Sequence, residues 1–177
     1  ESLGRLSVAT LLTALDDQHP RVREHAVRLA DRRPTEASLF EKLVRLTEDD
    51  DARVRYQLAF SLGEFPSTPA RNLALARLAV RDGAGRYPKA AIFSSLSRGA
   101  GDVLADLAGR ADYAATPAGG EMLESLATQI GQQLDTTDVE PFESVVMSSL
   151  KSGSSAALRL VAGHLTGRAR APAARRD

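Results

Sequence analysis

Few side chains in this sequence could hold a metal ion, and their spacing fits none of the common metal sites. The histidines His19, His25 and His164 include no i, i+4 pair of the kind that binds zinc on one helix, and cysteine is absent. The acidic run 48–51 lacks the alternating ligands and the distal glutamate of a calcium loop. We therefore expect no metal and no cofactor, and we interpret the acidic run as a turn that caps the next helix.

Motifs for phosphate binding and for nucleophilic catalysis are also incomplete. Residues 82–86 read Asp-Gly-Ala-Gly-Arg, a stretch that lacks Gly-Lys-Ser/Thr and follows no predicted strand. Ser94 and Ser95 have no histidine or acid at a spacing typical of a hydrolase. We expect a protein that is not an enzyme.

Two Arg-Val-Arg segments bring charge to corresponding places in the chain, and their arginines allow two interpretations. They could form a basic stripe that binds phosphate. Alternatively, Arg23 pairs with Asp17 and Arg55 pairs with Asp49. We favour the ion pairs, because each arginine comes with its own acid; such half-buried pairs fix geometry more than they add stability.

The block that holds these charges occurs twice, which indicates a repeat. Residues 17–30 and 49–62 align with Arg53 on Arg21, at an offset of 32 residues. Residues 87–96 continue the pattern, with Ile92 aligned on Leu58. A fixed period in this range is typical of a solenoid built from stacked helix pairs.

Apolar residues recur three and four positions apart throughout the chain, and no segment alternates like a strand. We therefore predict an all-α fold, an α-α superhelix of about five helix pairs. The repeat domain covers 1–167, regular over about 6–98 and degenerate over about 99–167, and a basic tail or linker follows at 168–177. The second helices of the first two units should bury Val22 and Val54. Residues 116–120 are expected to form the longest loop.

The block Asp-x5-Val-Arg resembles HEAT repeats, which are armadillo-like α-solenoids. It occurs at Asp17 with Val22 and Arg23, and at Asp49 with Val54 and Arg55. The resemblance implies that the valines are core residues and that the aspartates and arginines form a ladder between neighbouring repeats. The third unit departs from the motif. It keeps Asp82, but Pro88 stands at the valine position and Lys89 at the arginine position.

A narrower resemblance covers about residues 10–100. The runs 53–64 and 86–96 are similar to the HEAT segment of large multidomain bacterial proteins, found in planctomycetes and their relatives, that also contain a dehydrogenase-like β-propeller and a cytochrome c domain. The haem attachment motif Cys-x-x-Cys-His is absent, so no redox chemistry carries over. This resemblance implies a spacer or docking module cut from a longer chain, as the start at Glu1 also indicates. It is the sole basis for expecting a periplasmic or exported protein, and the localisation is otherwise unknown.

Composition bears on the class of partner. Lys+Arg and Asp+Glu are both 23, aromatic residues make up 5% and tryptophan is absent, which disfavours a nucleic-acid binder. No apolar run approaches the roughly 20 residues of a membrane span. We expect the partner to be a protein or a neighbouring domain of the same chain.

The second helices of such superhelices usually line the concave face where partners bind. Outward positions there give four contact candidates, Arg28, Tyr56, Gln57 and Phe60. Tyr56 and Phe60 lie side by side at i, i+4, although Phe60 could instead pack against the neighbouring unit. We predict a non-catalytic interaction or scaffold module. The alternative is a HEAT-like nucleic-acid-binding or DNA-repair domain, as in alkylpurine DNA glycosylases, which would need a basic groove with aromatics and a catalytic aspartate.

Overall fold

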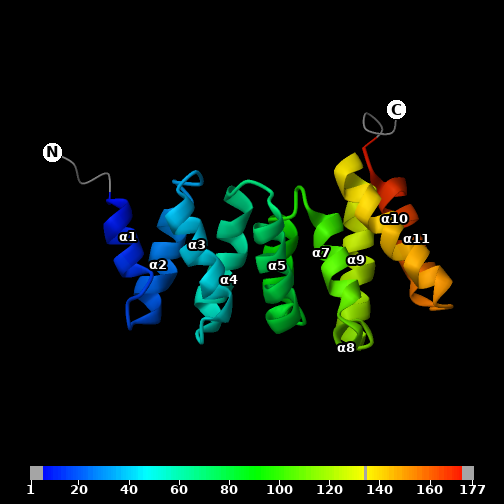
Figure 1. Cartoon of the computed structure of the whole chain (residues 1–177), viewed down its shortest axis with the longest axis horizontal. Coiled ribbons are helices and arrows are strands. Elements are labelled where there is room, and N and C mark those ends of the chain that lie inside the picture. Colours follow the sequence, from blue (N-terminus) through cyan, green and yellow to red (C-terminus); the bar gives the residue numbers. More distant parts are fainter. Residues whose placement is uncertain (1–5, 134, 173–177) are drawn as a thin grey trace.

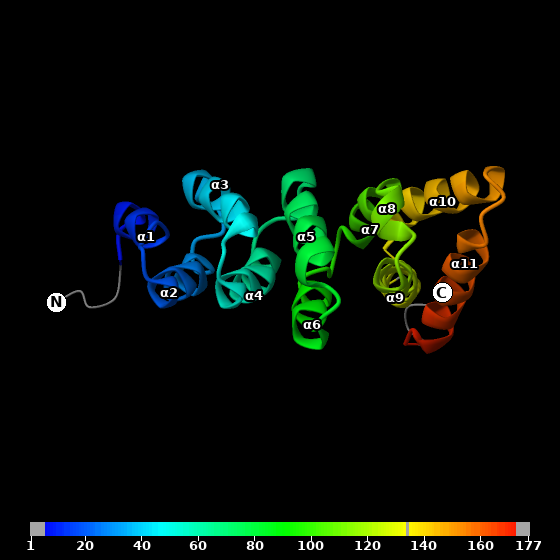
Figure 2. The same cartoon turned by 90° about the horizontal axis from the view of Figure 1, so that it is seen from below.

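The computed structural model describes residues 6–133 and 135–172, and in that part of the chain every regular element is a helix (Figure 1). Figure 2 shows the helices in two rows. The A row contains α1 (Val8–Ala14), α3 (Ala37–Arg45), α5 (Pro69–Asp82), α7 (Ala100–Gly109) and α10 (Thr136–Lys151). The B row contains α2 (Pro20–Ala30), α4 (Ala52–Ser61), α6 (Arg86–Ser94), α9 (Pro117–Gln133) and α11 (Ala156–Arg170). Three short segments complete the chain: α8 (Ala111–Ala114) and the 3-10 turns η1 (Leu46–Glu48) and η2 (Leu62–Glu64).

One A helix followed by one B helix makes a pair, and the pairs stack along the long axis of the molecule (Figure 1). The described residues thus form an α-solenoid of helix pairs, and the predicted all-α fold is confirmed. The core lies between the rows, where Leu39, Leu58, Leu75 and Leu104 are fully buried. Each such leucine stabilises the fold by about 1.5–3 kcal/mol relative to an exposed one.

Local sequence sets where the B helices begin. His19 precedes α2, and its Nδ1 accepts a hydrogen bond from the backbone N–H of Arg21 at 3.2 Å, with Pro20 at the first helical position. Asp51, the last residue of the acidic run, caps α4 by accepting the N–H of Arg53 at 2.8 Å. Each cap satisfies a backbone donor that has no partner within its own helix.

Val22 and Val54 occupy the same place in their helices but not the same environment. Val54 is fully buried, whereas Val22 is 40% exposed. The prediction that Val22 is a core residue is therefore wrong. The reason is position in the stack: α4 packs between α2 and α6, but α2 has a described B helix on one side only.

Two predicted boundaries are also wrong. Residues 116–120 do not form a long loop, because Pro117 starts α9 and residues 117–120 make its first turn. Helix α11 continues to Arg170, so residues 168–170 belong to the last helical turn rather than to a tail, and Ala171 is buried. Proline at a helix start and arginine in a last turn are both favourable, which explains how these residues extend the helices. Residues 173–177 lie outside the described residues.

Arg23 and Arg55 pair with the acid of the following unit. The Nε and Nη2 atoms of Arg23 donate to both carboxylate oxygens of Asp49, at 2.7 and 2.8 Å. Arg55 makes the same two contacts with Asp82, both at 2.7 Å. The expected ion pairs of Arg23 with Asp17 and of Arg55 with Asp49 are therefore wrong, because each arginine binds the carboxylate of the next unit instead.

The aspartate in each arginine's own unit accepts a hydrogen bond through its backbone carbonyl oxygen instead. The Nη1 of Arg23 donates to the carbonyl oxygen of Asp17 at 2.8 Å, and that of Arg55 donates to the carbonyl oxygen of Asp49 at 2.6 Å. Each guanidinium thus joins its own turn to the next unit. We call these contacts the Arg–Asp ladder, made of Arg23, Asp49, Arg55 and Asp82.

The ladder perturbs the charges within it. The hydrogen bond that Arg23 donates to Asp49 raises the pKa of Arg23, and the bond that Arg55 donates to Asp82 raises the pKa of Arg55. Burial alone would raise the pKa of the Asp49 carboxyl, but hydrogen bonds from Arg23 and from the N–H of Asp51 outweigh it, so that this pKa lies below its usual value.

Lys89 stands where the third unit would have the ladder arginine. Its Nζ lies 2.8 Å from an Oε1 of Glu121, in the first part of α9. Lys89 therefore also pairs with an acid of the following unit. It makes only one contact, to an exposed carboxylate, so this ion pair stabilises the fold less than the two-contact pairs of Arg23 and Arg55 do.

Beyond the ladder, a buried carboxylate links the later A helices. Asp138 of α10 is 2% exposed and accepts the backbone N–H groups of Gly99 and Gly101, at 3.2 and 3.0 Å, where α7 begins. Burial raises the pKa of Asp138. Gly99 has a φ of 85°, and a Cβ there would overlap the side chain of Asn72 in α5. The joint between α5, α7 and α10 therefore requires glycine at this position.

Candidate protein-interaction face

The four contact candidates lie on two neighbouring B helices. Arg28 is in the last turn of α2 and exposed, and Tyr56, Gln57 and Phe60 are on α4. The rings of Tyr56 and Phe60 meet edge to face, with their centroids 5.1 Å apart. Such a pair holds both rings in one orientation and contributes about 0.5–1.5 kcal/mol beyond burial.

The four side chains differ in how far they are exposed to a partner. Phe60 is 39% exposed. Tyr56 is partly buried and packs against the core. Gln57 is also partly buried, and its amide donates to the hydroxyl of Ser61 at 3.2 Å. A partner on this face would therefore touch Phe60 and Arg28 first, with Tyr56 supporting the phenylalanine ring from the side.

Further along the B row, a groove opens between α6, α9 and the end of α11. Figure 2 shows α9 lying between α6 and α11. The groove has a volume of about 660 Å³. Its lining includes Lys89, Phe93, Gln129, Gln132, Gln133 and Arg170. No sequence motif assigned a binding role to these residues. The available signal was the three glutamines at 129, 132 and 133, whose spacing places their amides on one side of a helix.

Polar contacts hold the walls of this groove together. The side-chain amide of Gln129 donates to the carbonyl oxygens of Phe93 and Leu96, at 3.1 and 2.7 Å, and that of Gln133 donates to Leu96 at 2.7 Å. The Nζ of Lys89 lies 6.0 Å from the centroid of the Phe93 ring. These bonds join α9 to carbonyl groups at the end of α6 and just beyond it; the carbonyl of Phe93 also accepts the backbone N–H of Leu96.

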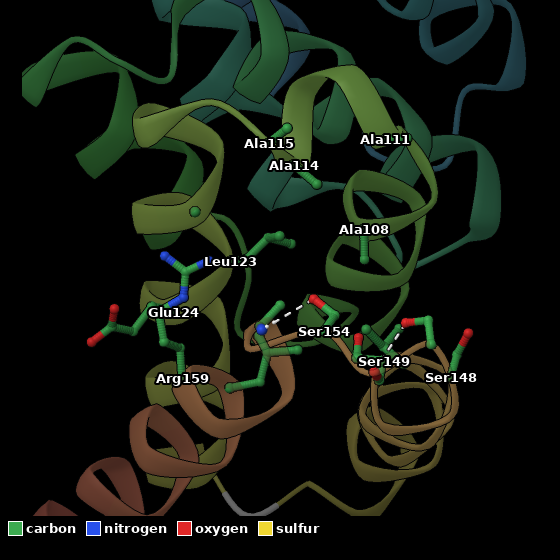
Figure 3. A pocket seen from close by; sticks show the side chains of 15 residues that line it. Ala108, Ala111, Ala114, Ala115, Leu123, Glu124, Ser148, Ser149, Ser154 and Arg159 are labelled. Atoms are coloured by element: carbon green, nitrogen blue, oxygen red, sulfur yellow. Dashed lines mark hydrogen bonds between the residues drawn. The ribbon is translucent and has the colours of Figure 1, made fainter.

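A second cavity, of about 400 Å³, lies among α7, α8, α9, α10 and α11 (Figure 3). Its walls are mostly alanines and serines, such as Ala108, Ala114 and Ser149. Figure 3 shows Glu124 and Arg159 on one side of it and Ser148 and Ser149 on the other. Of the serines that line it, Ser152 donates to the carbonyl oxygen of Ser149 at 3.0 Å and Ser154 accepts the N–H of Ala156 at 3.2 Å, so these two hydroxyls take part in hydrogen bonds at helix ends.

His164, a candidate for catalysis or metal binding, has a packing role instead. His164 stacks on Phe142, with ring centroids 4.6 Å apart, and burial together with Arg168 lowers its pKa. Within residues 6–133 and 135–172, no group of three or more His, Asp or Glu side chains is placed to hold a metal ion. None of the helices described there is both long and apolar enough to cross a membrane.

Three of the four arginines in the two Arg-Val-Arg segments already pair with carboxylates. Arg23 and Arg55 belong to the Arg–Asp ladder, and Arg21 pairs with Glu24 at 2.9 Å. Arg53 is exposed. A phosphate backbone would have to compete with these carboxylates, which disfavours the basic-stripe interpretation.

The family described as HEAT repeats matches residues 8–97. No curated protein and no solved structure matches the chain.

Proposed function

The chain belongs to the HEAT-repeat family, and from this we propose that it is a non-catalytic interaction or scaffold module whose B row binds a protein partner. HEAT repeats generally mediate protein–protein contacts or scaffolding. The observation that supports the B row as the contact surface is the Tyr56–Phe60 pair, an exposed aromatic ring held at a fixed angle beside an arginine-bearing helix. Aromatic and arginine side chains are enriched among residues that dominate interface energies.

The proposed mechanism is geometric. The Arg–Asp ladder joins the first helix pair to the second and the second to the third, so that Arg28 on α2 and Phe60 on α4 keep a constant separation. A rigid surface loses little entropy on binding, which favours affinity. In a longer parent protein, the same stack would hold neighbouring domains at a set distance.

Site-specific photo-crosslinking tests this proposal. A photoreactive phenylalanine analogue replaces Phe60, and in a matched control it replaces Val80, which is 40% exposed on α5 in the A row. We expect one discrete protein adduct from position 60 in an extract of the source cells, and none from position 80. Unlabelled wild-type chain should compete for the adduct, whereas an Arg28→Glu chain should compete at least about tenfold less well.

Equal adducts from both positions would contradict the proposal, and so would equal competition by the Arg28→Glu chain. Binding of duplex DNA at physiological salt, lost when Arg53 is changed, would instead support the nucleic-acid alternative.

A further inference from the structure

The last helix pair carries an apolar face that no described helix covers. Met147 and Leu150 of α10 are 53% and 54% exposed, and Leu158 and Leu165 of α11 are 73% and 59% exposed. Helix α10 packs on α7 and α11, and α11 packs on α9 and α10. In the part of the chain that the structure describes, the opposite sides of both helices have no neighbour. Apolar area of this kind, gathered on one face, is typical of an interaction surface.

Spacing places these residues on one stripe of each helix. The α10 stripe is Glu140, Glu143, Met147 and Leu150, and the α11 stripe is Leu158, Val161, Leu165 and Arg168. Both follow the intervals three, four, three, which keep side chains on one side of a helix. We call the two stripes together the end face.

The end face is divided by charge as well as by helix. On α10 the acids come first and the apolar residues follow, whereas on α11 the apolar residues come first and Arg168 follows. The helices are joined by residues 152–155 and run antiparallel, and the stacking of Phe142 on His164 sets their register. The acidic end of one stripe therefore lies at the same level as the basic end of the other.

We propose that the end face binds the end face of a second copy of this chain, through a two-fold axis that runs parallel to the helices and between the two rows. This rotation places α10 of one copy on α11 of the other, antiparallel. Glu140 and Glu143 then lie level with Leu165 and Arg168 of the second copy, and Met147 and Leu150 lie level with its Leu158. Every contact occurs twice, as an isologous interface requires.

Charge complementarity selects this occupant over a head-to-tail stack of copies. Head-to-tail stacking would place α11 against α2 of the next chain. Helix α11 has Arg159, Arg168 and Arg170 and no acid, and α2 has three arginines against one acid, Glu24, which pairs with Arg21, so both helices are net positive. Like charges would meet in that arrangement, whereas the two-fold arrangement pairs acid with base.

The end face is separate from the B-row surface of the proposed function, so that either proposal can fail alone. Its residues are exposed, and substitutions there leave the core intact. Sedimentation velocity of the 177-residue chain measures the association directly. We expect the wild-type chain to move from 18.9 kDa toward twice that mass as its concentration rises through the micromolar range, about 1–100 µM.

Charge reversal tests the register. Glu143→Arg alone and Arg168→Glu alone should each weaken the dimer about tenfold, because each places like charges together twice per dimer. The double variant should restore the dissociation constant to within about threefold of wild type. Leu165→Glu should weaken dimerisation more than about 100-fold, and Tyr87→Glu, at a site 70% exposed on α6, should leave it unchanged.

Three results would overturn the proposal: a wild-type chain that stays at 18.9 kDa throughout, growth beyond the dimer into open-ended assemblies, or a double variant that associates no better than either single reversal. Unchanged helicity in all variants, and an unchanged thermal midpoint at a concentration low enough that wild type is also monomeric, show that the measured changes arise at the interface.

Discussion

Asp49 connects two arginines from different units. Its carboxylate accepts both hydrogen bonds from Arg23, and its carbonyl oxygen accepts one from Arg55. The side chain of Asp49 is only 4% exposed, so removing its charge would leave a poorly solvated guanidinium without its partner. At the scale of single residues, this carboxylate contributes most to the alignment of the first two units.

Asp49→Asn should therefore lower the free energy of unfolding by about 3 kcal/mol at pH 7. The pKa of Asp49 is depressed in the folded chain. Its contribution to stability is present above the unfolded pKa of about 4 and is lost as the pH falls through the folded value. Urea denaturation at pH 7 and at successively lower pH measures the free energy of unfolding, and the difference between wild type and variant should shrink below about pH 4.

Asp50→Asn, at an exposed neighbouring acid, serves as control and should change stability by less than about 0.5 kcal/mol. A difference that is constant with pH would contradict the role of the Asp49 charge.

Val54 and Val22 offer a matched test of burial at one helical position. Val54→Asp places a carboxylate in a fully buried site and should cost at least about 4 kcal/mol, enough to unfold α4 or the whole array. Val22→Asp changes a side chain that is 40% exposed in the first turn of α2, where an acid is favourable, and should cost less than about 1 kcal/mol. Thermal unfolding followed by circular dichroism distinguishes the two. Equal losses would show that the two valines are equivalent after all.

At the scale of elements, α9 and α11 form the most extensive helix contact among the described residues. Glycines make this approach possible: a Cβ on Gly167 would lie 1.9 Å from the carbonyl oxygen of Thr128, and one on Gly131 would lie 2.1 Å from that of His164. Backbones this close exclude any side chain between them. The pair α9–α11 therefore replaces the Arg–Asp ladder, which ends earlier, with direct backbone packing.

Gly167→Ala should destabilise the chain by about 1–3 kcal/mol, because the helices must separate to admit a methyl group. Gly109→Ala is the matched control, since a Cβ at Gly109 in α7 would meet no atom within 4 Å. That change should raise stability by about 0.5 kcal/mol through helix propensity. Chemical denaturation of both variants measures the difference. If Gly167→Ala were as stable as Gly109→Ala, the close contact of α9 and α11 would be refuted.

At the scale of the whole molecule, stability should vary along the stack. Each helix pair contacts only its neighbours, so that end pairs lose half of their stacking contacts. Helix α1 packs mainly on α2 and α3, whereas α5 packs on helices before and after it. We expect backbone amides of α1 to exchange with deuterium at least about tenfold faster than those of α5. Exchange followed by mass spectrometry tests this, and similar protection in α1 and α5 would contradict a nearest-neighbour array.

Much of this architecture could be predicted from the order of the residues. The apolar period, the caps at His19 and Asp51 and the absence of an alternating pattern depend on neighbours in the chain, and they led to the correct all-α solenoid. The prediction that Val54 is buried is confirmed for the same reason. Arg28, Tyr56, Gln57 and Phe60 stay predictions as partner contacts, although helical spacing did place Tyr56 beside Phe60.

The sequence by itself determined the helices and their stacking into pairs, because propensity, capping and amphipathicity act within a few residues. Only the tertiary structure decided which acid each arginine meets, why Val22 is exposed while Val54 is buried, and that the last pair brings Glu143 and Arg168 near His164. These properties depend on which unit stands next in the stack. Two positions with the same local sequence differ in burial and in partner whenever one of them has a neighbour that the other lacks.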